Sequence, residues 1–181
     1  MGGVEMVEQG IGAFVIRADD GDSVQLPGGV GVHFKIEGDQ TRGAVSIVEH
    51  PVPPGAFALP HTHTREDEIS YVLDGVIGAE IGGQELTVEA GEYLFKPRGV
   101  KHAFWNPSDR PALLIEVIAP AGLERFFREL GTLRPVPGTP DYARAMDLLA
   151  ETAVSHFDER EAFLARHDLR AFDMFGARAP R

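Results

Sequence analysis

GAFALPHTHTREDEISYVLDG, residues 55–75, and GEYLFKPRGVKHAFWN, residues 91–106, decide the fold of this chain. Both stretches begin at a glycine and contain residue types that bind transition metals. His61, His63 and Glu68 lie in the first stretch, and His102 lies in the second. Three imidazoles and one carboxylate suit a divalent transition metal and have few other common uses. The two stretches therefore predict one metal site built from separate parts of the chain.

The spacing of these residues favours strands. Residues i and i+2 of a strand point to the same face, so His61 and His63 can reach a single ion. Glu68 follows His63 at an odd offset, and it reaches the same side only if the chain bends between them. The polar residues 64–67 provide a segment with low strand propensity for that bend.

The fixed positions of the two stretches resemble the paired motifs of the cupin superfamily. They match in residue type and spacing at Gly55, His61, His63, Glu68 and Gly75, and then at Gly91, Pro97, Gly99, His102 and Asn106. The resemblance is to small single-domain cupins similar to quercetin dioxygenase-like proteins. It implies a double-stranded β-helix, the jelly-roll cupin barrel, with His61, His63, Glu68 and His102 as metal ligands.

The rest of the chain divides at Pro120. Short apolar runs separated by turn residues between residues 13 and 120 indicate a mainly β domain, expected over 1–120 with a barrel core of about 24–120. The stretch 121–181 has helical periodicity instead, with helices expected near 123–130, 140–153 and 158–167. We expect this C-terminal helical extension to pack on the barrel or at a dimer interface. Its tail, residues 170–181, carries Phe172 and Phe175.

Two residues near the motifs are candidates for substrate contact. Phe104 shares strand parity with His102, and Val72 shares it with Glu68, so both face the barrel interior. Packing in the core is the simpler interpretation of each. Trp105 has the opposite parity and is expected to pack between layers or at the surface.

Other polar residues have ordinary interpretations. Glu66 and Asp67 flank Glu68, and the sequence favours solvated loop charges for both. His156 and His167 lie on expected helices and are interpreted as surface or interface residues.

Composition excludes several classes of protein. The formal net charge of −11 argues against nucleic-acid binding, and no apolar run is long enough to suggest a membrane span. The start of the chain shows no secretory signal, so a cytoplasmic location is expected. With no cysteine, thiolate ligands and disulfides are excluded.

The ligand set leaves coordination positions open for catalysis. One divalent transition metal per chain is expected, and Fe, Mn, Ni, Co, Cu and Zn all accept this set. The resemblance implies a dioxygenase acting on an enolisable or phenolic small molecule, with Glu68 accepting the proton of a substrate hydroxyl. A non-oxidative isomerase or decarboxylase and a non-catalytic binding protein are the alternatives. A homodimer is expected, because barrels of this kind often pair through edge strands.

Overall fold

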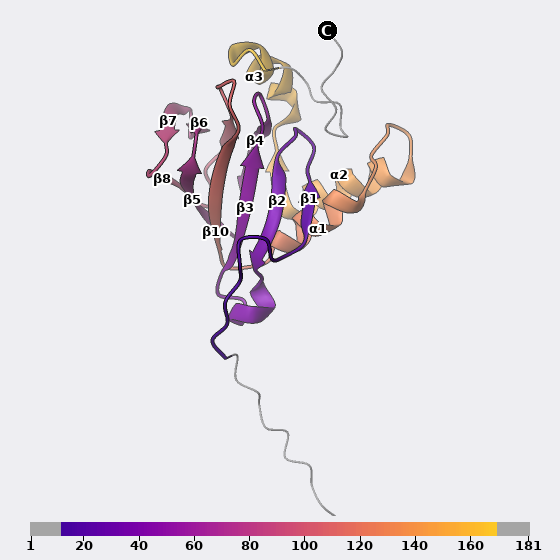
Figure 1. Cartoon of the computed structure of the whole chain (residues 1–181). Coiled ribbons are helices and arrows are strands. Elements are labelled where there is room, and N and C mark those ends of the chain that lie inside the picture. Colours follow the sequence, from indigo (N-terminus) through magenta and orange to yellow (C-terminus); the bar gives the residue numbers. More distant parts are fainter. Residues whose placement is uncertain (1–11, 170–181) are drawn as a thin grey trace, which may run out of the picture.

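The computed structural model describes residues 12–169, which form two antiparallel β-sheets packed face to face with helices at the C-terminal end (Figure 1). The mainly β fold with C-terminal helices that the sequence predicts is confirmed. In the described residues the six-stranded sheet has the order β1 (Ser23–Gln25), β2 (Gly31–Ile36), β3 (Ser46–Val52), β10 (Ala112–Ala119), β5 (Asp67–Asp74) and β8 (Tyr93–Lys96). The five-stranded sheet has the order β11 (Ala153–Ser155), β4 (Phe57–His63), β9 (His102–Trp105), β6 (Val76–Ile81) and β7 (Gln84–Glu89). A short 3-10 helix, η1 (Gly38–Thr41), joins β2 to β3.

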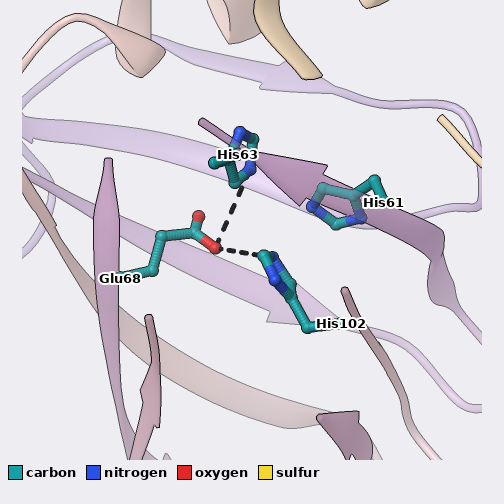
Figure 2. Close-up of side chains that lie close together, drawn as sticks. All are labelled: His61, His63, Glu68 and His102. Carbon is teal, nitrogen blue, oxygen red and sulfur yellow. Dashed lines mark ion pairs between the residues drawn. The ribbon is translucent and has the colours of Figure 1, made fainter. Parts of the chain in front are cut away.

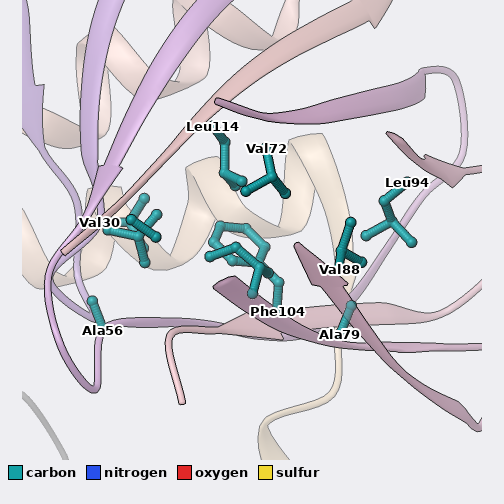
Figure 3. Close-up of a cluster of buried hydrophobic side chains, with 11 residues drawn as sticks. Val30, Ala56, Val72, Ala79, Val88, Leu94, Phe104 and Leu114 are labelled. Atoms are coloured by element: carbon teal, nitrogen blue, oxygen red, sulfur yellow. The ribbon is translucent and has the colours of Figure 1, made fainter. Parts of the chain in front are cut away.

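The core lies between the two sheets. Buried and partly exposed residues alternate strictly along β3 and β10, because successive side chains of a strand point to opposite faces. The central cluster includes Val30, Val72, Phe104 and Leu114 (Figure 3). These side chains come from both sheets, so their burial holds the sheets together.

Two glycines keep neighbouring strands close. Gly75 has φ +82° in the turn between β5 and β6, and a Cβ there would lie 2.8 Å from Ala112. At Gly78 a Cβ would lie 2.3 Å from the Trp105 ring, so only glycine lets the indole lie across β6.

The C-terminal helices cover parts of both sheets. Helix α1 (Leu123–Thr132) packs Leu123 and Phe127 against Phe34 of β2, and α2 (Pro140–Thr152) begins at a Thr139 cap. Helix α3 (Arg160–Arg166) buries Phe163 near β4. None of the helices in residues 12–169 is both long and apolar enough to cross a membrane.

The extension differs from the sequence prediction in two details. The third helix starts as a 3-10 turn, η2 (Phe157–Glu159), and becomes α-helical only at Arg160. Strand β11 was not predicted: it follows α2 directly and pairs antiparallel with β4, opposite residues 61–63. The tail with Phe172 and Phe175 lies outside the described residues, and the domain boundary near residue 120 stays a prediction.

Candidate metal centre

Three strands bring the four predicted ligands to one point. His61 and His63 come from β4, Glu68 from β5, and His102 from β9, where it pairs with His61. One ligand atom of each residue lies within 4.8 Å of the others (Figure 2). Nε2 of His102 lies 3.1 Å and Nε2 of His63 lies 3.8 Å from Oε2 of Glu68. The predicted convergence is therefore present, and metal binding by these residues stays a prediction.

Hydrogen bonds join the loops beside the cluster. The bend at residues 64–66 lets Glu68 face the same interior as His63. The amide of Gly99 donates to the carbonyl of His63 at 2.7 Å, which joins the two motifs. Arg98 donates to both carboxylate oxygens of Asp67, at 3.0 and 2.7 Å.

Backbone carbonyls orient two of the imidazoles. Nδ1 of His61 lies 2.6 Å from the carbonyl oxygen of Leu59, and Nδ1 of His102 lies 3.0 Å from that of Val100. Because a carbonyl oxygen only accepts, each Nδ1 must carry the proton and donate it. Nε2 of both rings is then an unprotonated donor atom available to a metal, as in ligating histidines whose other nitrogen is hydrogen-bonded.

The electrostatics of the cluster also suit a cation. Burial, together with the neighbouring imidazoles, holds the pKa of His61 well below its usual value, and burial lowers the pKa of His63. Burial alone would raise the pKa of Glu68, but the Lys96 ammonium and the imidazoles together hold it well below its usual value. At neutral pH the site therefore offers neutral His61 and His63 imidazoles and the Glu68 carboxylate, the forms that bind metals.

Three buried atoms of the cluster have unmet bonding capacity. Within residues 12–169, Nδ1 of His63, Oε2 of Glu68 and Nε2 of His102 are buried without a well-formed hydrogen bond. Such orphaned atoms are rare in folded proteins and call for an unseen ion or water. The donor set, its protonation and these atoms fit one divalent transition metal.

A buried lysine that the sequence prediction missed lies behind Glu68. Lys96 is only 2% exposed, and its Nζ lies 3.2 Å from Oε2 of Glu68 and 2.9 Å from Oε2 of Glu116. Ser70 donates to the same Glu116 oxygen at 2.8 Å. The available signal was strand parity: Lys96 shares the inward face with Leu94, and it pairs with Glu68 across β5 and β8.

The lysine is charged and shared between two carboxylates. Burial lowers the pKa of Lys96, but the carboxylates of Glu116 and Glu68 raise it by a larger amount. The net shift of the Lys96 pKa is therefore upward. Burial raises the pKa of Glu116 to about 7, against the opposing effect of Lys96. The second carboxylate is therefore the one that can gain a proton near neutral pH.

The predicted substrate contacts lie in the core. Val72 and Phe104 are both buried in the central cluster, where Figure 3 shows them beside Leu114. The Phe104 ring lies 5.4 Å from Nζ of Lys96, so this cluster adjoins the charged network. Their role in substrate binding stays a prediction.

One polar residue of this region differs from its predicted environment. Glu66 is buried, not solvated: only 6% of it is exposed, and burial raises its pKa although Arg65 lies 3.3 Å away. His167, directly after α3, lies at an interface, one of the two positions predicted for it, because its ring stacks on Trp105 with centroids 3.7 Å apart. Trp105 packs between β9 and α3, one of the two predicted positions. His156 lies between β11 and η2, and its Nε2 is 3.2 Å from Oγ1 of Thr62.

Comparison with known proteins identifies relatives that match part of this chain. Tetracenomycin polyketide synthase protein TcmJ of Streptomyces glaucescens is 30% identical over 44% of this chain and 52% of its own length. Quercetin 2,3-dioxygenase of Bacillus subtilis is 27% identical over 70% of this chain and 38% of its own length. This chain thus spans about half, or less, of the length of these relatives.

The fold has counterparts among solved structures. An RmlC-like cupin from Shewanella frigidimarina superposes with a TM-score of 0.54 at 20% identity, covering 63% of this chain and 96% of its own. The cupin domain family matches residues 48–118, which include both motifs and all four residues of the cluster. Residues 48–118 therefore match the cupin domain family, and the β part of this chain has the fold of an RmlC-like cupin.

Proposed function

We propose that this chain is a metal-dependent oxidoreductase of the dioxygenase type, acting on an enolisable or phenolic small molecule. The observation that carries the proposal is the cluster of His61, His63, Glu68 and His102, with ligand atoms within 4.8 Å of one another and protonation states suited to a cation. Four protein ligands leave positions free on a six-coordinate ion, which is typical of catalytic sites. A bound divalent metal would supply Lewis acidity towards a substrate hydroxyl and a site for dioxygen chemistry.

The relatives support both the oxidative reaction and the enolisable substrate of this proposal. Similarity to a quercetin 2,3-dioxygenase supports an oxidative reaction. Similarity to a polyketide synthase protein supports an enolisable substrate, since polyketide chains carry β-dicarbonyl groups. Cupins also include non-oxidative enzymes, so fold alone does not choose between these reactions.

The residues of the site take distinct roles in the proposed reaction. The Leu59 and Val100 carbonyls hold the His61 and His102 rings in one tautomer, which fixes where Nε2 points. Glu68 accepts the substrate proton on a carboxylate oxygen. Its low pKa makes it a weak base, so it suits only a hydroxyl that is already acidified. The apolar cluster with Val72 and Phe104 excludes water from the interior next to the site.

Oxygen consumption tests the proposal directly. The purified full chain is analysed for its metals, and apo protein is then loaded with Fe, Mn, Co, Ni, Cu or Zn separately. Each form is offered a panel of phenolics and 1,3-diketones in an oxygen electrode. We expect uptake with at least one metal, and its loss in His102→Ala.

A matched histidine gives the control. His33→Ala removes a half-exposed imidazole of β2 outside the cluster and should leave both bound metal and uptake unchanged. No uptake with any metal would refute the oxidative proposal. Turnover under strict anaerobiosis would replace it with isomerisation or decarboxylation, and tight substrate binding without turnover would indicate a binding protein.

A further inference from the structure

Three arginines line one pocket between η1 and the start of α1. The pocket has a volume of about 410 Å³, within the usual range of small-molecule sites. Its charged lining residues are Arg42, Arg65, Arg125 and Asp39, and small residues of the same two segments complete the wall. We call it the arginine pocket. None of the four residues of the metal cluster lines it.

Hydrogen bonds join the two segments that form the pocket. The amide of Ala121 donates to the carbonyl of Gly43 at 3.1 Å, and the amide of Gly43 donates to the carbonyl of Gly38 at 2.8 Å. Figure 1 shows η1 at the bottom of the β structure, below β2. The wall of the pocket is therefore part of the hydrogen-bonded fold.

Arg65 lies against this wall. Its Nη2 donates to the carbonyl of Ala121 at 3.1 Å, and its Nη1 lies 3.3 Å from Oε1 of Glu66. A Cβ at Gly122 would lie 2.7 Å from Nη1 of Arg65, and the φ of +143° at this position also favours glycine. The missing side chain of Gly122 thus leaves the space that the guanidinium occupies.

Arg42 adds a guanidinium without a partner. Within residues 12–169 its side chain has no ion pair and no hydrogen bond. Arg42 ends η1 with a φ of 55°, a left-handed conformation that glycine or asparagine usually adopts at the end of a helix. An arginine is less stable than glycine in this conformation, and its unpaired charge lies in the lining of the pocket.

The charge of the lining suits a dianion. Three arginines and one aspartate give it a net charge of +2, in a chain whose formal net charge is −11. Asp39 pairs with Arg125 at 2.7 Å, but the Asp39 side chain is 88% exposed, so water weakens this pair. A phosphate group carries about −1.5 to −2 at neutral pH, and guanidinium groups bind its oxygens in pairs.

Two more carboxylates lie behind the wall without lining the pocket. Glu66 is buried and pairs with Arg65, which is therefore partly neutralised. Glu124 is also buried, and its two oxygens accept hydrogen bonds from the amides of residues 38 and 122. Arg42 keeps its full charge, since neither carboxylate pairs with it.

We propose that the arginine pocket binds a phosphate group, either inorganic phosphate or the phosphate of a small ester. Arg42 and Arg125 donate to the phosphate oxygens, and the phosphate replaces Asp39 as the partner of Arg125. Because Arg65 belongs to the bend between β4 and β5, the bound phosphate also contacts the segment that separates the candidate metal ligands of those strands. This site does not depend on the proposed oxidative reaction.

Isothermal titration calorimetry on the full chain tests the proposal, with inorganic phosphate and glycerol 3-phosphate as probes. Sodium chloride keeps the ionic strength constant, because salt screens the attraction between exposed charges. We expect saturable binding of one phosphate per chain, with a dissociation constant below about 1 mM. Tighter binding of inorganic phosphate would support the free ion as the ligand, and tighter binding of glycerol 3-phosphate would support an ester.

Substitutions in the lining should change the affinity in opposite directions. Arg42→Gln and Arg125→Gln should each weaken binding at least about tenfold, because each removes a charged hydrogen bond to the phosphate. Asp39→Asn should tighten binding by up to about fivefold, because it frees Arg125 from its carboxylate partner. All three side chains are exposed, so these variants should fold, which circular dichroism checks.

Arg110→Gln is the matched control, because it removes one exposed arginine that precedes β10, at the end of that strand away from the pocket. It should leave the affinity unchanged. Binding of both probes to the wild type weaker than about 1 mM would overturn the proposal. So would an affinity that Arg42→Gln and Arg125→Gln leave unchanged, since the phosphate would then bind elsewhere, or one that Arg110→Gln lowers equally.

Discussion

Replacing Lys96 with methionine removes the one buried cation that lies between Glu68 and Glu116 in the described structure. Methionine keeps the length and packing of the side chain but leaves two carboxylates without their shared partner. Removing one partner of a buried ion pair costs roughly 3–5 kcal/mol. We expect the lower end, about 3 kcal/mol for the apo protein at neutral pH, because Glu116, whose pKa is already about 7, can take up a proton.

Urea unfolding followed by tryptophan fluorescence measures this loss. The single tryptophan, Trp105, is buried between β9 and α3 and reports on the folded packing. A loss of about 3 kcal/mol also predicts a melting temperature lower by roughly 6–12 °C. The loss should be smaller at pH 5, where Glu116 is already protonated.

The double variant Lys96→Met/Glu116→Gln provides the decisive comparison. It removes the charge of Glu116 together with that of Lys96, so it should recover much of the stability lost in the single variant. If Lys96→Met were as stable as the wild type, or if the double variant were no more stable than the single one, the buried charge network described here would be wrong.

Three further outcomes follow from the site and its surroundings. His61→Ala and His102→Ala should each lose most of the bound metal, measured by elemental analysis, while their circular dichroism stays that of a folded protein; full retention of metal in either variant would contradict the ligand assignment. Because the folded-state pKa of Glu116 is raised from 4.5 to about 7, its ionisation costs stability as pH rises through that window, and Glu116→Gln should gain up to about 3 kcal/mol relative to the wild type between pH 4.5 and 7; parallel stability curves for the two proteins would rule this out. His167→Ala removes the ring stacked on Trp105 and should cost roughly 1 kcal/mol and shift the tryptophan emission, with His33→Ala as the silent control; an unchanged emission would show that the stacking is absent in solution.

The sequence predicts the ligand cluster because its geometry is mostly local. His61 and His63 need only strand parity, and the glycines of the two motifs place the turns that bring His102 to them. The charged network behind the ligands was missed because it depends on register. Lys96 meets Glu68 across β5 and β8, and it meets Glu116 only because β10 lies on the other side of β5.

The C-terminal differences have a similar origin. A strand as short as β11 has too few residues for any periodicity, and it forms because β4 has an open edge beside it. The burial of His167 depends on Trp105, far away in the sequence. Glu66 was assigned to solvent by its loop composition, whereas the packing around the bend covers it.

The pairing of β11 with β4 has a practical consequence for anyone trimming this chain. Residues 153–155 lie opposite His63, Thr62 and His61, so they supply the outer neighbour of the strand that carries two candidate ligands. A fragment cut to residues 48–118, the segment that matches the cupin domain family, would leave that strand with unpaired amides and carbonyls, a template for aggregation. Expression clones and crystallisation fragments should therefore include β11 and the residues that follow it through Leu169.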